Sequence, residues 1–292
     1  MNKEKAIKAL LTGAAFAGFI FLIGIFITLF AGSWTAIKNI NQMHFIFGLE
    51  WMPYYEPPEY GILSMFISSA LIGFCSSLIC IPLGLGTAIY MYEIAGRKQK
   101  KFLKPALEIL AGIPSIIFGF FAMAVLGPFL QNLFDLPSGL CILTASIALG
   151  IMTVPLISSI SEDALSVVPI SFKEASFALG ANRCQTLIRV VIPAAASGII
   201  TSIILAFGRI VGETMIVLMA SGGAIAVPNS PFAPARPLTS TIAAEMGEAA
   251  YGSLHFSALF EIGLFLFALT FILNFAAEKV GKKYRLKLGQ GR

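Results

Sequence analysis

Residues 162–193 read EDALSVVPISFKEASFALGANRCQTLIRVVIP, a long polar and amphipathic insertion between two strongly apolar stretches. Pro169 suits the first turn of a short helix, where its missing N–H is no loss, and Gly180 suits the left-handed residue that ends one. A second amphipathic run, 185–192, is expected to end at Pro193. The pattern predicts two short helices joined at a glycine. Such a segment either docks into a soluble partner and carries motion into the membrane, or lies on lipid headgroups.

The composition indicates an all-α integral membrane protein. The chain is 57% hydrophobic and only 12% charged, with a mean hydropathy of +0.86, whereas soluble domains carry about a quarter charged residues. A spanning helix needs about 20 mostly apolar residues. Six stretches meet this requirement: 10–32, 63–92, 106–130, 140–161, 194–221 and 257–277. The first is longer than the apolar region of a signal peptide, about 7–15 residues, so we expect an uncleaved helix.

The distribution of Lys and Arg predicts the orientation. Seventeen of the twenty such residues lie at the termini, in the 94–105 connection or in the 162–193 segment, while the opposite connections hold only Lys38 and Arg236. Cationic loops stay on the cytoplasmic side, so we expect both termini and the 162–193 segment there. The net charge of +5 then faces anionic membrane lipid and requires no nucleic acid.

One stretch predicted to span the membrane carries a cation and a carboxylate close together. Arg209 and Glu213 stand four residues apart in the 194–221 stretch, with Thr214 beside them. An intramembrane Arg costs about 2.5–3.5 kcal/mol, so it must face something polar. At this spacing the pair can form a salt bridge on one helix face, which serves either as a permanent ion pair between helices or as an anion contact. In the second case the planar guanidinium binds an oxyanion, Glu213 holds it, and Thr214 adds a hydroxyl.

Pro82, Pro114 and Pro155, each with nearby glycines, interrupt three successive apolar stretches. Such interruptions arise either from close helix packing through small residues or from a helix that lines a wet cavity. Three in succession favour a translocation path.

The connections expected outside carry weaker signals. Residues 33–62 are rich in aromatic residues, which form either a membrane-interface belt or a docking surface. In 222–256 we expect a loop and a short helix capped by Thr239 or Ser240. His44 and His255 are isolated in these outer loops, and neither makes a site on its own.

The four cysteines lack metal-ligand spacing. On the cytoplasmic side, we expect the 94–105 connection to be a short basic turn.

The 162–193 segment also contains a recognisable motif. Glu174-Ala175-Ser176, then Gly180, then Val190-x-Ile192-Pro193 resembles the EAA motif of ABC importer permeases, with Ser in place of the second Ala, Val in place of Ile and Ile in place of Leu. The resemblance implies that this segment is the coupling helix that fits a cleft in a cytoplasmic ATPase. Glu174, Ala175, Ser176, Gly180 and Pro193 are then its coupling residues.

Longer stretches resemble the PstC branch of these permeases. They are IPLGLGTAIYMYE (81–93), LEILAGIPSIIFGFFAM (107–123), IMTVPLISSISEDALSVVP (151–169), KEASFALGANRCQTLIRVVIPAAASGI (173–199) and GRIVGETMIVLMASG (208–222). The resemblance implies the MetI-like fold of type I ABC importer permeases in a prokaryotic inner or plasma membrane, with phosphate as cargo. On this view 1–62 is an N-terminal helix and outer loop, and 63–292 the permease core.

The resemblance also implies partners. These are a PstA-like permease subunit in a heterodimer, a PstB-like ATPase dimer and an extracytoplasmic phosphate-binding protein. No G-x-x-x-x-G-K-[ST] phosphate loop occurs in the chain, so we expect Mg-ATP to be handled by the ATPase, with no catalytic or metal-ligating residue and no cofactor here. The residues alone leave open sulfate, molybdate or tungstate as cargo, and an ATP-independent secondary transporter or channel.

Overall fold

A computed structural model describes residues 2–289. Six helices in this range are long and apolar enough to cross a membrane: Leu10–Asn39, Leu63–Ile94, Ser115–Phe134, Ile142–Ser166, Arg183–Val211 and Leu254–Ala276. The predicted fold class, an all-α membrane protein with six spans, is confirmed. The orientation of the termini stays a prediction. Arg292, one of the residues in the Lys and Arg distribution on which that prediction depends, lies outside the described residues.

The chain forms two compact units, the first made of residues 1–63 and 241–269. Its N-terminal part contains α1 (Asn2–Asn39), α2 (Gln42–Phe47) and a two-stranded antiparallel sheet of β1 (Trp51–Met52) and β2 (Glu59–Tyr60). Helix α13 (Leu254–Gly289) packs on α1 at Gly32, where an added Cβ would clash with the ring of Phe260. A glycine is therefore needed for this close approach.

A buried polar cluster holds the sheet in the first unit. The indole Nε1 of Trp51 donates to Glu245 Oε2 at 2.8 Å, and His255 Nε2 lies 2.9 Å from the same oxygen. All three side chains are buried. His44 in turn lies 3.2 Å from Glu59. The expectation that the two histidines are isolated is wrong, because the fold brings Glu59 to His44 and Glu245 to His255.

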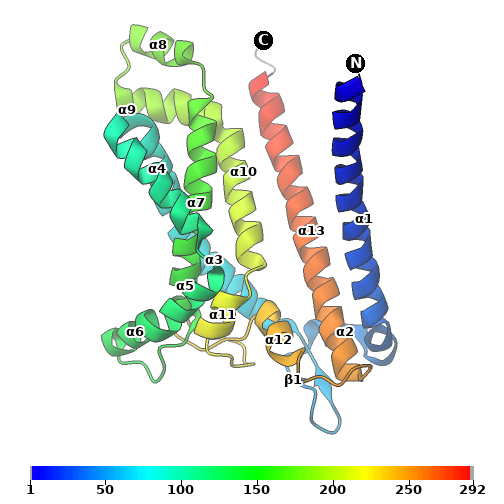
Figure 1. The fold of residues 1–292 in the computed structure, drawn as a ribbon. Helices are drawn as coiled ribbons and strands as arrows, with labels where there is room; N and C mark the ends of the chain where they lie inside the picture. The colour runs from blue at the N-terminus through cyan, green and yellow to red at the C-terminus, as the bar shows by residue number, and fades with distance from the viewer. Residues whose placement is uncertain (1, 290–292) are drawn as a thin grey trace. The chain divides into compact units, whose positions relative to one another are not determined.

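The second unit, residues 64–240 and 270–292, has α7 at its centre. In Figure 1, α7 and α10 run side by side, with α8 and α9 near one end and α5, α6 and α11 near the other. Apolar residues of α7, including Ile142, Leu149 and Ile157, are fully buried. Its elements in order are α3 (Leu63–Ile89), η1 (Tyr90–Ile94), α4 (Arg97–Gly112), α5 (Ser115–Phe121), η2 (Ala122–Leu126), α6 (Gly127–Phe134), α7 (Ile142–Ser166), α8 (Ile170–Ala178), α9 (Arg183–Thr186), η3 (Leu187–Val191), α10 (Ile192–Val211) and α11 (Met215–Ala220). Helix α12 (Leu238–Glu245) begins in this unit and ends in the first.

The span predicted at 106–130 is corrected by the structure. The chain breaks at Ile113, which is extended (φ −68°, ψ 127°), as expected for a residue before proline. The span then runs from Ser115 to Phe134. The basic stretch 94–105, predicted as a turn, is mostly the first half of α4, which begins after Gly96, whose N–H donates to Gln99 Oε1 at 2.9 Å.

The sequence pattern predicts that the second amphipathic run ends at Pro193, and this prediction is wrong. The run continues through η3 into α10, so that a single span covers Arg183–Val211. In η3 the N–H of Ile192 donates to the carbonyl of Leu187, five residues back. The wider turn lies directly before Pro193, which has no N–H to contribute.

Gly84 of α3 and Gly150 of α7 serve helix packing. A Cβ on Gly84 would lie 2.7 Å from the Cβ of Ile157, and one on Gly150 would lie 3.0 Å from the Cβ of Ile79. Each glycine therefore admits an isoleucine of the facing helix. Of the two explanations for these glycines, close packing accounts for this pair.

Candidate functional site

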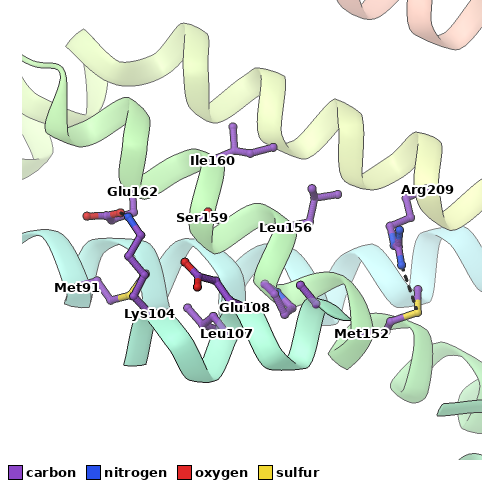
Figure 2. Close-up of a pocket in the computed structure, with 12 residues that line it drawn as sticks. Met91, Lys104, Leu107, Glu108, Met152, Leu156, Ser159, Ile160, Glu162 and Arg209 are labelled. Carbon is purple, nitrogen blue, oxygen red and sulfur yellow. Dashed lines mark hydrogen bonds and ion pairs between the residues drawn. The ribbon is translucent and has the colours of Figure 1, made fainter. Parts of the chain in front are cut away.

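A cavity of about 260 Å³ lies in the second unit. Residues of η1, α4, α7 and α10 line it, among them Met91, Lys104, Glu108, Met152, Pro155, Ser159, Glu162 and Arg209 (Figure 2). Helix α4 contributes Lys104 and Glu108, one turn apart, and α7 contributes the opposite wall. The cavity has charged groups in a wall that is otherwise largely apolar.

Arg209 lies in the last turn of α10 and lines this cavity. Its guanidinium points toward Met152, with Nη2 at 3.9 Å from the sulfur (Figure 2). Among the residues that the structure describes, no carboxylate forms an ion pair with it. A guanidinium has five N–H donors, and a thioether is only a weak acceptor. Arg209 thus retains the donors that a bidentate contact with an oxyanion requires.

Glu213 is not the partner of Arg209 that the sequence spacing predicted. Helix α10 ends at Val211, and the chain leaves helical geometry before α11 begins at Met215. The buried Glu213 carboxylate accepts the backbone N–H groups of Met215 (3.0 Å) and Ile216 (3.3 Å). A carboxylate at a helix N-terminus satisfies otherwise unpaired N–H groups, and this local bonding takes precedence over an i,i+4 pair.

The turn between α10 and α11 is fixed from a second side. Thr239 donates its hydroxyl to the carbonyl of Glu213 at 2.8 Å. The hydroxyl of Thr214 lies 3.5 Å from the carbonyl of Gly212 within the turn itself. Of the three residues predicted along a substrate path, Arg209 lines the cavity, while Glu213 and Thr214 form the turn that follows it.

The other end of the cavity carries an ion pair that the sequence reasoning missed. Lys104 Nζ lies 3.2 Å from Glu162 and 3.8 Å from Asp163. The hydrogen bond to Glu162 raises the pKa of Lys104, as does the charge of that carboxylate. The i,i+4 spacing of Lys104 and Glu108 indicates a helix here, but the sequence pattern predicts a turn at 94–105 and a span only from residue 106.

The segment predicted to couple to a partner forms α8 and a glycine turn. Gly180 adopts φ +82°, which confirms the left-handed position expected of it. Ser176 is buried, and its hydroxyl lies 2.9 Å from that of Thr186. Glu174 and Ala175 are exposed. Glu174, Ala175 and Ser176 lie in α8 and Gly180 in the turn that follows it, whereas Pro193 stands in α10.

Large apolar side chains are exposed around α8. We call them the α8 patch: Val167, Ile170, Phe172, Phe177 and Leu179. Leu179 is 89% exposed and Val167 81%. Contiguous apolar exposure of this kind marks a surface that another molecule covers. No group of three or more metal-ligating side chains occurs among the described residues.

Residues 80–286 match the family described as binding-protein-dependent transport system inner membrane component. The chain belongs to this family. Within it the chain is similar to permeases of the PstC type. It is 36% identical over 279 residues to the phosphate transport system permease protein PstC of Mesorhizobium japonicum, covering 89% of this chain and 84% of that one.

Other relatives agree with this membership. The probable ABC transporter permease protein YqgH of Bacillus subtilis is 38% identical over 236 residues, which cover 81% of this chain and 76% of that protein. The probable phosphate transport system permease protein PstC of Methanocaldococcus jannaschii is 31% identical, with 98% and 96% covered. The resemblance to the PstC branch is therefore confirmed, and the chain is a multi-pass protein of a prokaryotic cell membrane.

Solved structures support the fold. The MetNI methionine ABC transporter matches with a TM-score of 0.57 at 22% identity, covering 77% of this chain and 94% of that one. A bacterial alginate ABC transporter in complex with a periplasmic protein matches with a TM-score of 0.66 at 13% identity, covering 94% of each chain. The expected MetI-like ABC importer permease fold is confirmed.

Proposed function

We propose that this chain is the permease subunit of an ATP-driven importer that moves inorganic phosphate into the cell. The observation that carries the proposal is Arg209, which lines the cavity and forms no ion pair among the described residues, while Glu162 in the same wall is paired with Lys104. A planar fork of N–H donors matches the oxygens of phosphate. The names of the relatives in Mesorhizobium and Methanocaldococcus supply the choice of phosphate.

The complex that we propose contains a PstA-like permease subunit, a PstB-like ATPase dimer and an extracytoplasmic phosphate-binding protein. Mg-ATP is bound and hydrolysed by the ATPase, and this chain holds no cofactor. The two permease subunits enclose the path, so the cavity beside Arg209 is one half of a site that the second subunit completes.

The α8 patch is the surface that we assign to the ATPase. Its apolar side chains are available for burial in a cleft, and the Gly180 turn sets the direction in which α8 projects. Glu174 and Ala175 lie exposed on the same short helix. Closure of the ATPase dimer on ATP would move α8 and, through it, the helices around the cavity.

Reconstituted transport tests this function. The complex in liposomes, supplied with the binding protein and internal ATP, should accumulate radiolabelled phosphate, and Arg209→Ala should reduce the rate about tenfold or more. Arg209→Lys should retain part of the activity, because it keeps the charge and loses the fork. Lys101→Ala, which removes an exposed cation elsewhere, is the matched control and should transport normally.

Three results would contradict the proposal. Uptake that continues without the ATPase would indicate a secondary transporter or channel. Uptake of sulfate, molybdate or tungstate in place of phosphate would retain the importer and change its cargo. Normal phosphate uptake by Arg209→Ala would remove the role assigned to the guanidinium.

A further inference from the structure

The π-helical turn η1, at the end of α3, contacts α8 through a pair of charged side chains. Lys173 of α8 places its Nζ 2.7 Å from Glu93 Oε2. The same ammonium lies 4.2 Å from the centre of the Tyr92 ring. Both partners belong to η1, so one lysine of α8 is held by two successive residues of a single turn.

This contact is stronger than a typical surface ion pair. The Lys173 and Glu93 side chains are only 21% and 18% exposed, and their separation of 2.7 Å is that of a charge-assisted hydrogen bond. Burial lowers the pKa of Lys173, while the hydrogen bonds and charges of Glu93 and Tyr92 raise it, and the net direction is upward. A raised lysine pKa means that the ammonium, and the stability it contributes, is complete at neutral pH and is lost only as the pH rises through that pKa.

The neighbouring residue of the same turn lines the cavity. Met91 is buried and stands in the cavity wall with Lys104 and Arg209. The carbonyl of Tyr92 also accepts a hydrogen bond from Lys100 of α4, at 3.5 Å. Residues 91–93 therefore touch the cavity, the helix that follows the turn, and α8.

A π-helical turn has a mechanical property that suits this position. Its hydrogen bonds run five residues back, as from the N–H of Ala95 to the carbonyl of Tyr90 at 2.8 Å. Such turns often occur at functional sites, and η1 is the last turn of its helix, because Ala95 after it is extended (φ −65°, ψ 125°). The hydrogen bonds of η1 depart from the regular α-helical pattern of α3. A change in the force that Lys173 exerts on Glu93 can therefore be taken up within η1 and displace Met91 without moving all of α3.

We propose that η1 transmits the motion of α8 to the wall of the cavity, with Lys173 and Glu93 as positioning residues. The inference rests on the proposed function, because it assumes that a partner moves α8. It differs from docking on the α8 patch, because the Lys173 side chain is directed at Glu93 and Tyr92 and is mostly buried. A complex that lacks this contact binds its ATPase and loses the link between hydrolysis and transport.

Two measurements on the full complex test the proposal. The first is the ratio of phosphate taken up to ATP hydrolysed, which should fall about tenfold in Lys173→Met or Glu93→Gln, with the ATPase captured as by the wild type. The exchange Glu93→Lys with Lys173→Glu should recover part of the ratio, and either charge reversal alone should be worst. Lys98→Met, which removes an exposed lysine near the turn, should leave the ratio unchanged.

The second measurement does not depend on the transported ion. In a background with Cys184→Ser, which removes the exposed thiol, Met91→Cys reports on the cavity wall through its rate of reaction with a soluble thiol reagent. We expect Mg-ATP to change this rate several-fold when Lys173 is present and to leave it unchanged in Lys173→Met.

The two measurements separate the possible failures. If the wild-type complex does not transport phosphate but Mg-ATP changes the labelling of Met91→Cys in a Lys173-dependent way, the proposed cargo is wrong and the transmission stands. If Lys173→Met retains both the uptake ratio and the nucleotide-dependent labelling, η1 does not transmit the motion. Loss of ATPase capture in Lys173→Met would also overturn the inference, since Lys173 would then serve docking.

Discussion

Arg209 and Glu213 lie on opposite sides of a helix break. Arg209 is in the last turn of α10 and lines the cavity, while the Glu213 carboxylate accepts two backbone N–H groups at the start of α11. The two residues therefore have separate tasks: the guanidinium is available to an anion, and the carboxylate holds the turn. Substitutions of Arg209 should therefore affect transport, and substitutions of Glu213 should affect stability.

Replacing Glu213 should lower stability through loss of the cap. Glu213→Ala removes the acceptor of two N–H groups and should cost about 1 kcal/mol of unfolding free energy. Glu213→Gln keeps one acceptor oxygen and should lose less. Thermal unfolding of the detergent-purified chain measures both. Equal stability of Glu213→Ala and the wild type would remove the capping role.

The hydroxyl pair of Ser176 and Thr186 should stabilise the 162–193 segment. Ser176→Ala or Thr186→Val leaves one buried hydroxyl without its partner at 2.9 Å, and each should cost about 1 kcal/mol. The double variant should lose less than the sum of the single variants, because both act on one contact. Additive losses in a double-mutant cycle would show that the hydroxyls act independently.

Gly84 should tolerate no side chain, while Gly86 should tolerate one. Gly84→Ala brings its Cβ within 2.7 Å of the Cβ of Ile157, and overpacking of this kind costs about 1–3 kcal/mol. No atom lies within 4 Å of a Cβ built on Gly86, so Gly86→Ala is the matched control. Comparable thermal stability of the two variants would argue against tight packing between α3 and α7.

Leu179 should contribute to capture of the ATPase and not to folding. It is 89% exposed, so Leu179→Ser should leave the unfolding temperature unchanged and weaken binding of the ATPase about tenfold. Tyr55→Ser, which alters another exposed apolar residue on the side expected to be outside, is the control. Undiminished capture by Leu179→Ser would indicate that the α8 patch faces something else, such as lipid.

Much of the fold was predictable, because membrane-spanning helices can be recognised by their length and hydropathy. All six spans were located. The errors lie where hydrogen bonds or a proline within a few residues determine whether a helix is interrupted. Pro114 was visible in the sequence, but nothing in hydropathy distinguishes a kink from a complete interruption. At Gly212 the competition between an i,i+4 salt bridge and a helix cap was decided by the cap, an outcome that spacing alone could not show.

The site was predictable only in part for a related reason. Arg209 was identified from the cost of burying its charge, a property of one residue. The pairs Lys104–Glu162, Lys173–Glu93 and Glu245–His255 join residues that are 58, 80 and 10 positions apart, and two of these separations exceed anything that periodicity can reveal. Such contacts follow from tertiary packing.

The interruption at residues 212–214 frees α10 from the short helix beyond it. Helix α11 packs closely on α5, where a Cβ on Gly119 would meet the sulfur of Met219 at 3.0 Å, and so resists rotation. An unbroken helix from Arg183 to Ala220 would have to twist as one rod and disturb that packing. Because the helix ends at Val211, a rotation that begins at Arg183 can move the Arg209 guanidinium near the other end. Helix α11 can then keep its packing on α5.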